Sequence, residues 1–188
     1  MSPSFPPRTW TREVSGTSYT ISTDPSLIQL DAVNAAFASD MVYWAKPLTP
    51  DALKICVEQS LCFGLYAAPA EDGNHQGQKA TPPPMTGFAR LVTDYTTFAY
   101  LTDVYILPAH QGRGLGKWLV QCVDEVLAGW PELRRCLLLT RDETAVRMYE
   151  AMMGARVITS EGGGGLFIME RKGGGNVYGD GNAGVGRE

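Results

Sequence analysis

The stretch HQGRGLGKW, residues 110–118, places three glycines within five positions and sets Arg113 and Lys117 among them. It follows an apolar, strand-like segment that ends at Pro108, and the spacing of apolar residues from Leu115 onward predicts a helix that begins near Gly114. Unpaired amide groups and the positive end of a helix dipole then meet at one point, where glycines let the backbone approach a ligand. The sequence therefore predicts a site for an anion such as a phosphate.

Two common phosphate loops do not match this run. A Walker A loop has the pattern GxxxxGK[ST], but here only three residues separate Gly112 from Gly116, and Trp118 stands where the magnesium-binding hydroxyl belongs. A dinucleotide fingerprint, GxGxxG, lies in the first βα turn of a parallel unit, whereas this run follows three strand-like segments joined by turns or loops. We therefore expect neither a nucleotide triphosphatase nor a dinucleotide-binding fold.

Residues 111–116, QGRGLG, match the [RQ]xxGx[GA] loop of the GNAT superfamily of acyl-CoA-dependent N-acyltransferases, which the chain resembles in the order of its elements from about Tyr19 to Arg171. The resemblance implies an N-acetyltransferase that transfers the acetyl group of acetyl-CoA to a primary amine by direct attack in a ternary complex, without a metal. A small-molecule acceptor is favoured. A protein N-terminus or lysine as acceptor, a non-catalytic acyl-CoA-binding module, and a glycine turn that only joins strand to helix stay open.

The same resemblance assigns the residues that would bind the cosubstrate. Backbone amides of the loop hold the pyrophosphate of coenzyme A in this family, which by position implies Gln111, Gly112, Arg113, Gly114, Leu115, Gly116 and Lys117. The pantetheine arm runs along the preceding strand through main-chain hydrogen bonds, which implies Val104, Tyr105 and Ile106.

The segment DETAVRMY, residues 142–149, resembles the family pattern NxxAxxxY. The match implies that Asp142 and Ala145 contact the pantetheine and that Tyr149 donates a proton to the departing thiolate. Asp142 departs from the pattern, because an ionised carboxylate accepts a hydrogen bond but cannot donate one. Gly154 also falls five residues after Tyr149 rather than the usual four. A tyrosine half-buried on a helix face is the alternative interpretation of Tyr149.

Asp103 is the candidate acid that orients or deprotonates the amine. Strand alternation puts Thr102, Val104 and Ile106 on one face and Leu101, Asp103 and Tyr105 on the other, unless a bulge shifts the register. The segment resembles the LEDxxV strand of spermidine/spermine acetyltransferases, with Thr102 replacing the acid usually assigned as base and Asp103 on the second acid. A carboxylate paired with Arg90 or with a loop amide is an equally open alternative.

The acceptor pocket in this family uses the segment between the first two helices, here MVYWAKP, residues 41–47. The resemblance implies that Tyr43 and Trp44 form aromatic walls around an amine, with Asp103 and Tyr105 as further acceptor contacts; packing in the core is the alternative. The two histidines, His75 and His110, give no reason to expect a catalytic triad or a metal site.

The remaining pattern predicts the elements that position these residues. Asp24 with Pro25 and Thr49 with Pro50 each open a helix, through about Phe37 and Gln59, after a strand at 19–24. Antiparallel strands follow at 61–67, 85–92 and 97–107, then a helix at 114–129, a buried strand at 135–141, a helix at 144–153 and strands at 155–159 and 165–171. We therefore expect one α/β (α+β) domain with a mixed, mostly antiparallel sheet of about seven strands and about four helices.

Composition is that of one soluble domain, with 44% apolar and 19% charged residues in 188. Residues 1–16 and 173–188 are rich in glycine, proline or serine and are predicted to be flexible, which leaves a domain at 17–172 with a long surface loop at 69–84. The net charge of −4 argues against nucleic acid or a membrane as partner and suits a cationic amine. Four dispersed cysteines predict reduced thiols and a cytoplasmic protein. We expect a monomer or a homodimer.

Overall fold

The computed structural model describes residues 6–68, 83–159 and 166–176, so most of the predicted 69–84 loop and both ends of the chain lie outside the described residues. The strands and helices follow in the order β1 (Thr9–Val14), β2 (Thr17–Ser22), α1 (Leu30–Phe37), α2 (Pro50–Glu58), β3 (Leu61–Ala67), β4 (Met85–Thr93), β5 (Phe98–Ile106), α3 (Leu115–Ala128), β6 (Arg135–Thr140), α4 (Glu143–Met153), β7 (Arg156–Thr159) and β8 (Phe167–Lys172).

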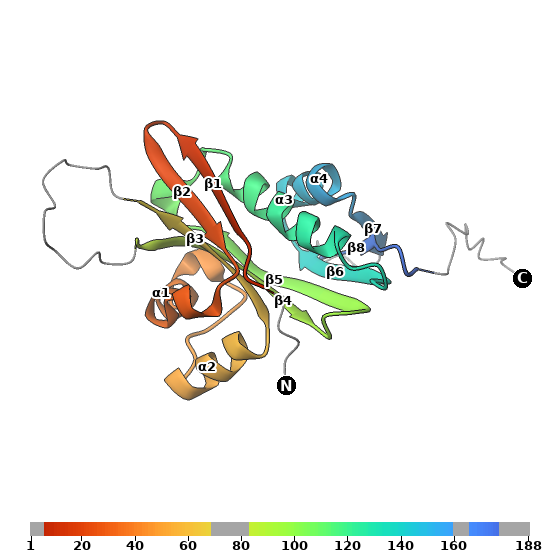
Figure 1. The fold of residues 1–188 in the computed structure, drawn as a ribbon, viewed down its shortest axis with the longest axis horizontal. Coiled ribbons are helices and arrows are strands. Elements are labelled where there is room, and N and C mark those ends of the chain that lie inside the picture. The colour runs from red at the N-terminus through yellow and green to blue at the C-terminus, as the bar shows by residue number, and fades with distance from the viewer. Residues whose placement is uncertain (1–5, 69–82, 160–165, 177–188) are drawn as a thin grey trace, which may run out of the picture.

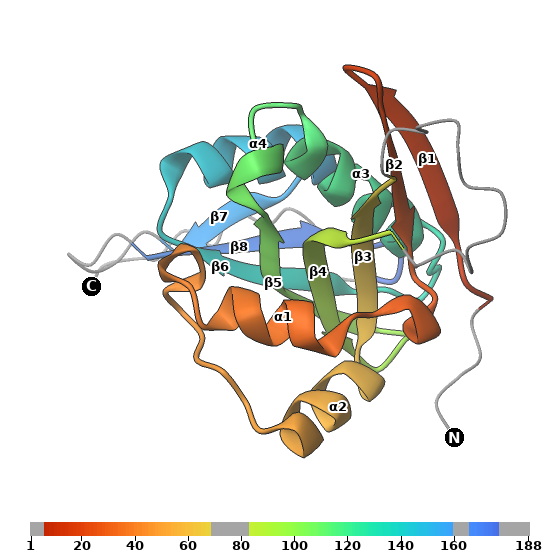
Figure 2. The same cartoon turned by 90° about the vertical axis from the view of Figure 1, so that its left-hand side faces the viewer.

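The described strands form one sheet in the order β1-β2-β3-β4-β5-β6-β8-β7, with β1 at one edge and β7 at the other (Figure 2). Neighbouring strands are antiparallel except β5 and β6, which are parallel because α3 crosses over between them. The predicted mixed, mostly antiparallel sheet is confirmed, with eight strands, and so are the four helices.

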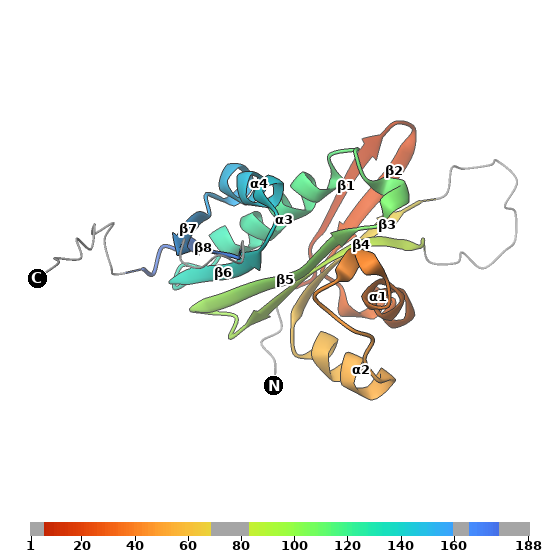
Figure 3. The same cartoon turned by 180° about the vertical axis from the view of Figure 1, so that it is seen from behind.

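Helices cover both faces of the sheet, with α3 and α4 on one side and α1 and α2 on the other (Figures 1 and 3). Each side has its own apolar core: Leu119 and Phe63 are fully buried in the core under α3, and Val33 and Phe88 in the core under α1 and α2. Within the described ranges, no helix has the length and apolar character needed to cross a membrane.

Two local predictions differ from the structure. Residues Thr9–Val14 lie in the segment predicted to be flexible but form β1, which pairs antiparallel with β2 over its whole length. The helix predicted from Pro25 is interrupted: Asp24 caps only a 3₁₀ turn, η1 (Pro25–Leu27), and α1 begins at Leu30. Between them the Gln29 side chain hydrogen-bonds the backbone of Pro83 and Met85, so tertiary contacts override the local helix signal.

Candidate functional site

The glycine run forms the connection between β5 and α3. A 3₁₀ turn, η3 (Pro108–His110), follows β5, and Gly112 and Gly114 then take left-handed conformations with φ of 74° and 75°. A Cβ atom at either glycine would meet nothing within 4 Å, so the backbone conformation, not lack of space, requires glycine there. Gly114 is the N-cap of α3 and supplies no side-chain cap.

Most backbone amides at the end of this connection have no hydrogen-bond acceptor among the described residues. The Gln111 amide donates to the Pro108 carbonyl at 3.2 Å and the Trp118 amide to the Gly114 carbonyl at 3.1 Å. Between these two, the amides of residues 112–117 donate to no acceptor anywhere in the described ranges. Exposed donors at the positive end of a 14-residue helix are suited to an anion. The residues predicted to bind phosphate therefore lie together, and no side chain of the described ranges caps these amides. Binding of a phosphate here stays a prediction.

Side chains around the loop hold it in place. Gln111 Nε2 donates to the Ile106 carbonyl at 2.8 Å, which ties the loop to the end of β5. Arg113 Nη1 donates to the Tyr19 hydroxyl at 3.2 Å, and that hydroxyl lies 3.0 Å from His110 Nδ1. Burial, and then the nearby charge of Arg113, lowers the pKa of His110. No sequence pattern indicated a role for Tyr19, because it lies 91 residues from His110 and only the folded chain brings the two side chains together.

The strand before the loop has a free edge next to these amides. β5 pairs with β6 only from Phe98 to Leu101, so Thr102–Ile106 have no strand partner on that side among the described residues. Polar backbone groups on such an edge are ready to pair with another extended chain. The predicted pantetheine-binding residues Val104, Tyr105 and Ile106 all lie on this segment.

The register of β5 shifts at a bulge, so its side chains do not lie on the faces of the sheet that simple alternation predicts. Phe88 lies opposite Tyr105 but Arg90 lies opposite Thr102, so Asp103 and Val104 share one position of the partner strand. Leu101 and Ile106 consequently belong with Val104 to the core on the α3 side. Thr102, through its pairing with Arg90, lies instead on the α2 side with Asp103 and Tyr105. The bulge named as the exception in the sequence analysis is therefore present, and it separates Leu101 from Asp103 and Thr102 from Val104.

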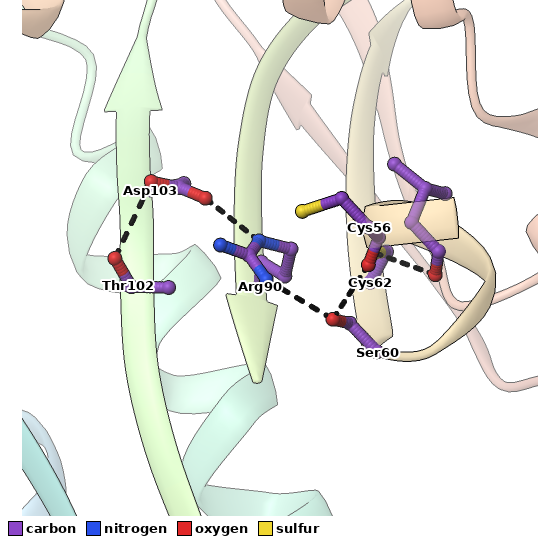
Figure 4. Close-up of polar contacts among 7 residues, drawn as sticks. Cys56, Ser60, Cys62, Arg90, Thr102 and Asp103 are labelled. Carbon is purple, nitrogen blue, oxygen red and sulfur yellow. Dashed lines mark hydrogen bonds and ion pairs between the residues drawn. The ribbon is translucent and has the colours of Figure 1, made fainter. Parts of the chain in front are cut away.

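Asp103 lies at the bulge and is paired with an arginine. Its side chain is 7% exposed, and its Oδ2 accepts a hydrogen bond from Arg90 Nε at 2.7 Å (Figure 4). Its Oδ1 accepts a longer hydrogen bond, 3.3 Å, from the Thr102 hydroxyl. Both carboxylate oxygens are thus engaged, which is the ion pair with Arg90 that the sequence left open as an alternative. A role of Asp103 in catalysis stays a prediction.

On α4, Tyr149 is 7% exposed and belongs to the core between α3, α4 and the sheet. Burial raises its pKa, with smaller contributions from Cys136 and Asp142, so the hydroxyl keeps its proton at neutral pH. Asp142 is the N-cap of α4 and accepts a hydrogen bond from the Thr144 amide at 2.8 Å. Because asparagine and aspartate both cap helices well, the departure from the family pattern at Asp142 costs the helix nothing. Ala145 is partly buried beside this core.

Tyr43 and Trp44 are not core residues. Their side chains are 65% and 47% exposed and meet edge to face, with ring centroids 5.1 Å apart. Tyr43 lines an open hollow of about 420 Å³ together with Asp40 and Lys46. The same segment approaches the loop, since Gln111 Nε2 lies 4.0 Å from the Met41 sulfur. Contact of these aromatic residues with an acceptor stays a prediction.

None of the four cysteines forms a disulfide within the described residues. Cys62, Cys122 and Cys136 are buried, Cys56 is partly buried, and all four are free. Among the described residues, no group of three or more histidine, cysteine, aspartate or glutamate side chains is placed to hold a metal ion.

Comparisons with known proteins agree with this geometry. The model of the acetyltransferase (GNAT) family matches residues 36–155. A Gibberella zeae protein named as an acetyltransferase is 44% identical over 172 residues, which cover 84% of this chain and 95% of that protein. A crystal structure of a GNAT-family protein from Xanthomonas campestris is 33% identical, with a TM-score of 0.55 over 71% of this chain and 82% of that chain.

The fold is shared with more distant enzymes. The ribosomal-protein-S18-alanine N-acetyltransferase of Escherichia coli superposes with a TM-score of 0.52 over 86% of this chain and 97% of that chain, at 21% identity. At that identity the likeness concerns the arrangement of strands and helices alone.

Proposed function

Because the chain belongs to the acetyltransferase (GNAT) family, we propose that it is an N-acetyltransferase that uses acetyl-CoA to acetylate the primary amine of a small molecule. One observation carries the proposal. The amides of residues 112–117 have no acceptor in the described parts of the chain, and they lie beside a strand edge, Thr102–Ile106, that is also unpaired. A diphosphate joined to an extended, amide-containing arm fits both features at once.

In this proposal different residues of the site bind different parts of acetyl-CoA. Acetyl-CoA supplies the acetyl thioester. The amides of residues 112–117 hold the pyrophosphate, and the positive charges of Arg113 and Lys117 add to the attraction. The backbone groups of Val104, Tyr105 and Ile106 bind the arm along β5, while Asp142 and Ala145, at the start of the helix that follows β6, border it on the other side.

Proton transfer needs two groups. Tyr149 donates a proton to the sulfur, and its buried, protonated hydroxyl suits that role. The amine must lose a proton before it can attack. Because both oxygens of Asp103 already accept hydrogen bonds, we assign Asp103 to orienting the amine and the strand, and removal of the proton to water.

Three features support a small amine as acceptor. The hollow beside Tyr43 has the volume of a small-molecule site, about 420 Å³. Asp40 and the exposed Tyr43 line this hollow, and a carboxylate and an aromatic ring can both attract a cation. The net charge of −4 attracts cationic substrates in general.

The experiment is a binding measurement followed by a turnover assay. Acetyl-CoA affinity is measured by calorimetry, and thiol release is then followed with three panels: small primary amines, peptides with a free N-terminus, and lysine peptides with a blocked N-terminus. We expect binding and thiol release with at least one small amine. Release with peptides alone would overturn the small-molecule part, binding without release would indicate an acyl-CoA-binding module, and failure to bind would overturn the proposal.

A further inference from the structure

We infer that Arg90 is a positioning residue for the transfer: through its ion pair with Asp103 it fixes the bulge at which β5 leaves β6, and so sets the strand edge that binds the arm of acetyl-CoA. The inference rests on the proposed function and adds a residue outside the family's loop and tyrosine patterns. Arg90 itself lies on β4 and takes no direct part in binding or proton transfer.

The bulge is a strained point of the backbone. Asp103 has a φ of +53°, in the left-handed region that residues other than glycine rarely adopt. Aspartate tolerates this region better than most residues, but the conformation still persists only where surrounding contacts hold it. Since the Asp103 side chain is 7% exposed, those contacts must come from the protein rather than from water.

Arg90 supplies these contacts and joins three segments. Its Nε donates to Asp103 at 2.7 Å and its Nη1 donates to the Ser60 hydroxyl at 3.1 Å (Figure 4). Ser60 in turn donates to the Cys56 carbonyl at 2.8 Å, in the last turn of α2. The guanidinium is therefore held from both sides. It connects the end of α2 through β4 to the bulge of β5 as one rigid arrangement.

The position of the bulge explains why this matters for the site. Pairing of β5 with β6 ends at Leu101, two residues before Asp103 at the bulge. A bulge increases the local twist and bends the strand, which turns the following residues away from the old neighbour. The free edge that begins at Thr102 thus depends on the bulge. A return to regular pairing would shift the register by one residue and exchange the faces of Val104 and Tyr105.

A purely structural ion pair is the competing explanation, and the chain contains a matched control. Arg171 on β8 pairs with Asp124 on α3 at the same distance, 2.7 Å, also through Nε, and its side chain is 14% exposed against 16% for Arg90. Loss of either arginine leaves a carboxylate without its partner. Only Arg90 contacts the bulge, so the two explanations predict different results for the two sites.

The test compares Arg90→Met with Arg171→Met using two ligands. Acetyl-CoA probes the loop and the strand edge together, whereas 3′-phospho-ADP, which lacks the pantetheine arm, probes the loop alone. We expect Arg90→Met to weaken acetyl-CoA binding about tenfold and to lower kcat, with less than about twofold change for 3′-phospho-ADP. Arg171→Met lowers the melting temperature but leaves both affinities unchanged.

A milder variant covers the case in which Arg90→Met does not fold. Arg90→Lys keeps the charge, but a lysine ammonium cannot hold Asp103 and Ser60 in the same planar geometry. It should weaken acetyl-CoA binding about threefold and leave 3′-phospho-ADP binding intact. Equal acetyl-CoA affinity and kcat in the Arg90 and Arg171 variants, with an active wild type, would overturn the inference alone. A wild type that binds no acetyl-CoA would overturn the proposed function, and the inference with it.

Discussion

Replacing Gly114 with alanine, with a matched control, distinguishes the effect of the loop's backbone conformation on unfolding free energy from the loop's role in binding acetyl-CoA. Gly114 has a φ of 75°, and an added Cβ would meet nothing within 4 Å, so the substitution causes no steric clash. Gly154, at the C-cap of α4, has a φ of 61° and the same open surroundings. Gly154→Ala is therefore a matched control for the backbone penalty at a position outside the glycine loop.

The expected magnitudes follow from the backbone and from the amides. A left-handed alanine costs about 1–2 kcal/mol, and the smaller entropy of the unfolded chain offsets roughly 0.4–1 kcal/mol of that. Both variants should lose about 1 kcal/mol of unfolding free energy, which lowers the melting temperature by about 2–4 °C. In Gly114→Ala, relief of the strain also turns the amides of residues 112–117 away from a common point. Loss of one such hydrogen bond to a charged phosphate costs about 1.5–3 kcal/mol, or about 10- to 150-fold in affinity.

The assay is calorimetric titration of acetyl-CoA into both variants, with the melting temperature measured in parallel. We expect similar melting temperatures and a large difference in affinity. If the two variants bind acetyl-CoA equally well, the amides at the start of α3 do not hold the cosubstrate, and the assignment of the whole loop is wrong.

Three further outcomes test other parts of the structure. Tyr149→Phe should lower kcat at least about 100-fold with little change in KM or melting temperature. Because burial raises the pKa of Tyr149, its hydroxyl stays protonated up to pH 10, so deprotonation of Tyr149 should cause no fall in wild-type activity below that pH. Burial raises the pKa of three thiols, Cys62, Cys122 and Cys136, from 9.0 to about 12. Their contribution to stability is therefore complete below pH 9 and is lost as the pH rises towards 12, which urea titrations at pH 8 and 10.5 would detect as a lower unfolding free energy at the higher pH. Leu119→Ala, in a fully buried position, should cost about 2–5 kcal/mol of unfolding free energy, whereas Leu139→Ala, at a residue that is 45% exposed, should change it by less than about 0.5 kcal/mol.

Features that depend on a few neighbouring residues could be predicted from the sequence. Left-handed glycines before an apolar helix, the Thr49 cap before Pro50, and Asp142 before α4 act through the local backbone, so their spacing alone is informative. The loop predicted to bind phosphate belongs to this class. Its amides are free because a helix begins there, whatever the rest of the fold does.

The tertiary structure decided what depends on residues far apart in the chain. Arg8 and Trp10, at the start of β1, contact Glu125, which lies more than a hundred residues away. A short and mostly polar segment contains no pattern from which these contacts could be predicted. The bulge of β5 and the pairing of Asp103 with Arg90 likewise depend on the alignment of two strands. The energy of such contacts exists only once the sheet has brought the partners together. The sequence alone could therefore name Asp103 as a candidate acid and Arg90 as one possible partner, but only the folded sheet determined that the carboxylate is paired with that arginine.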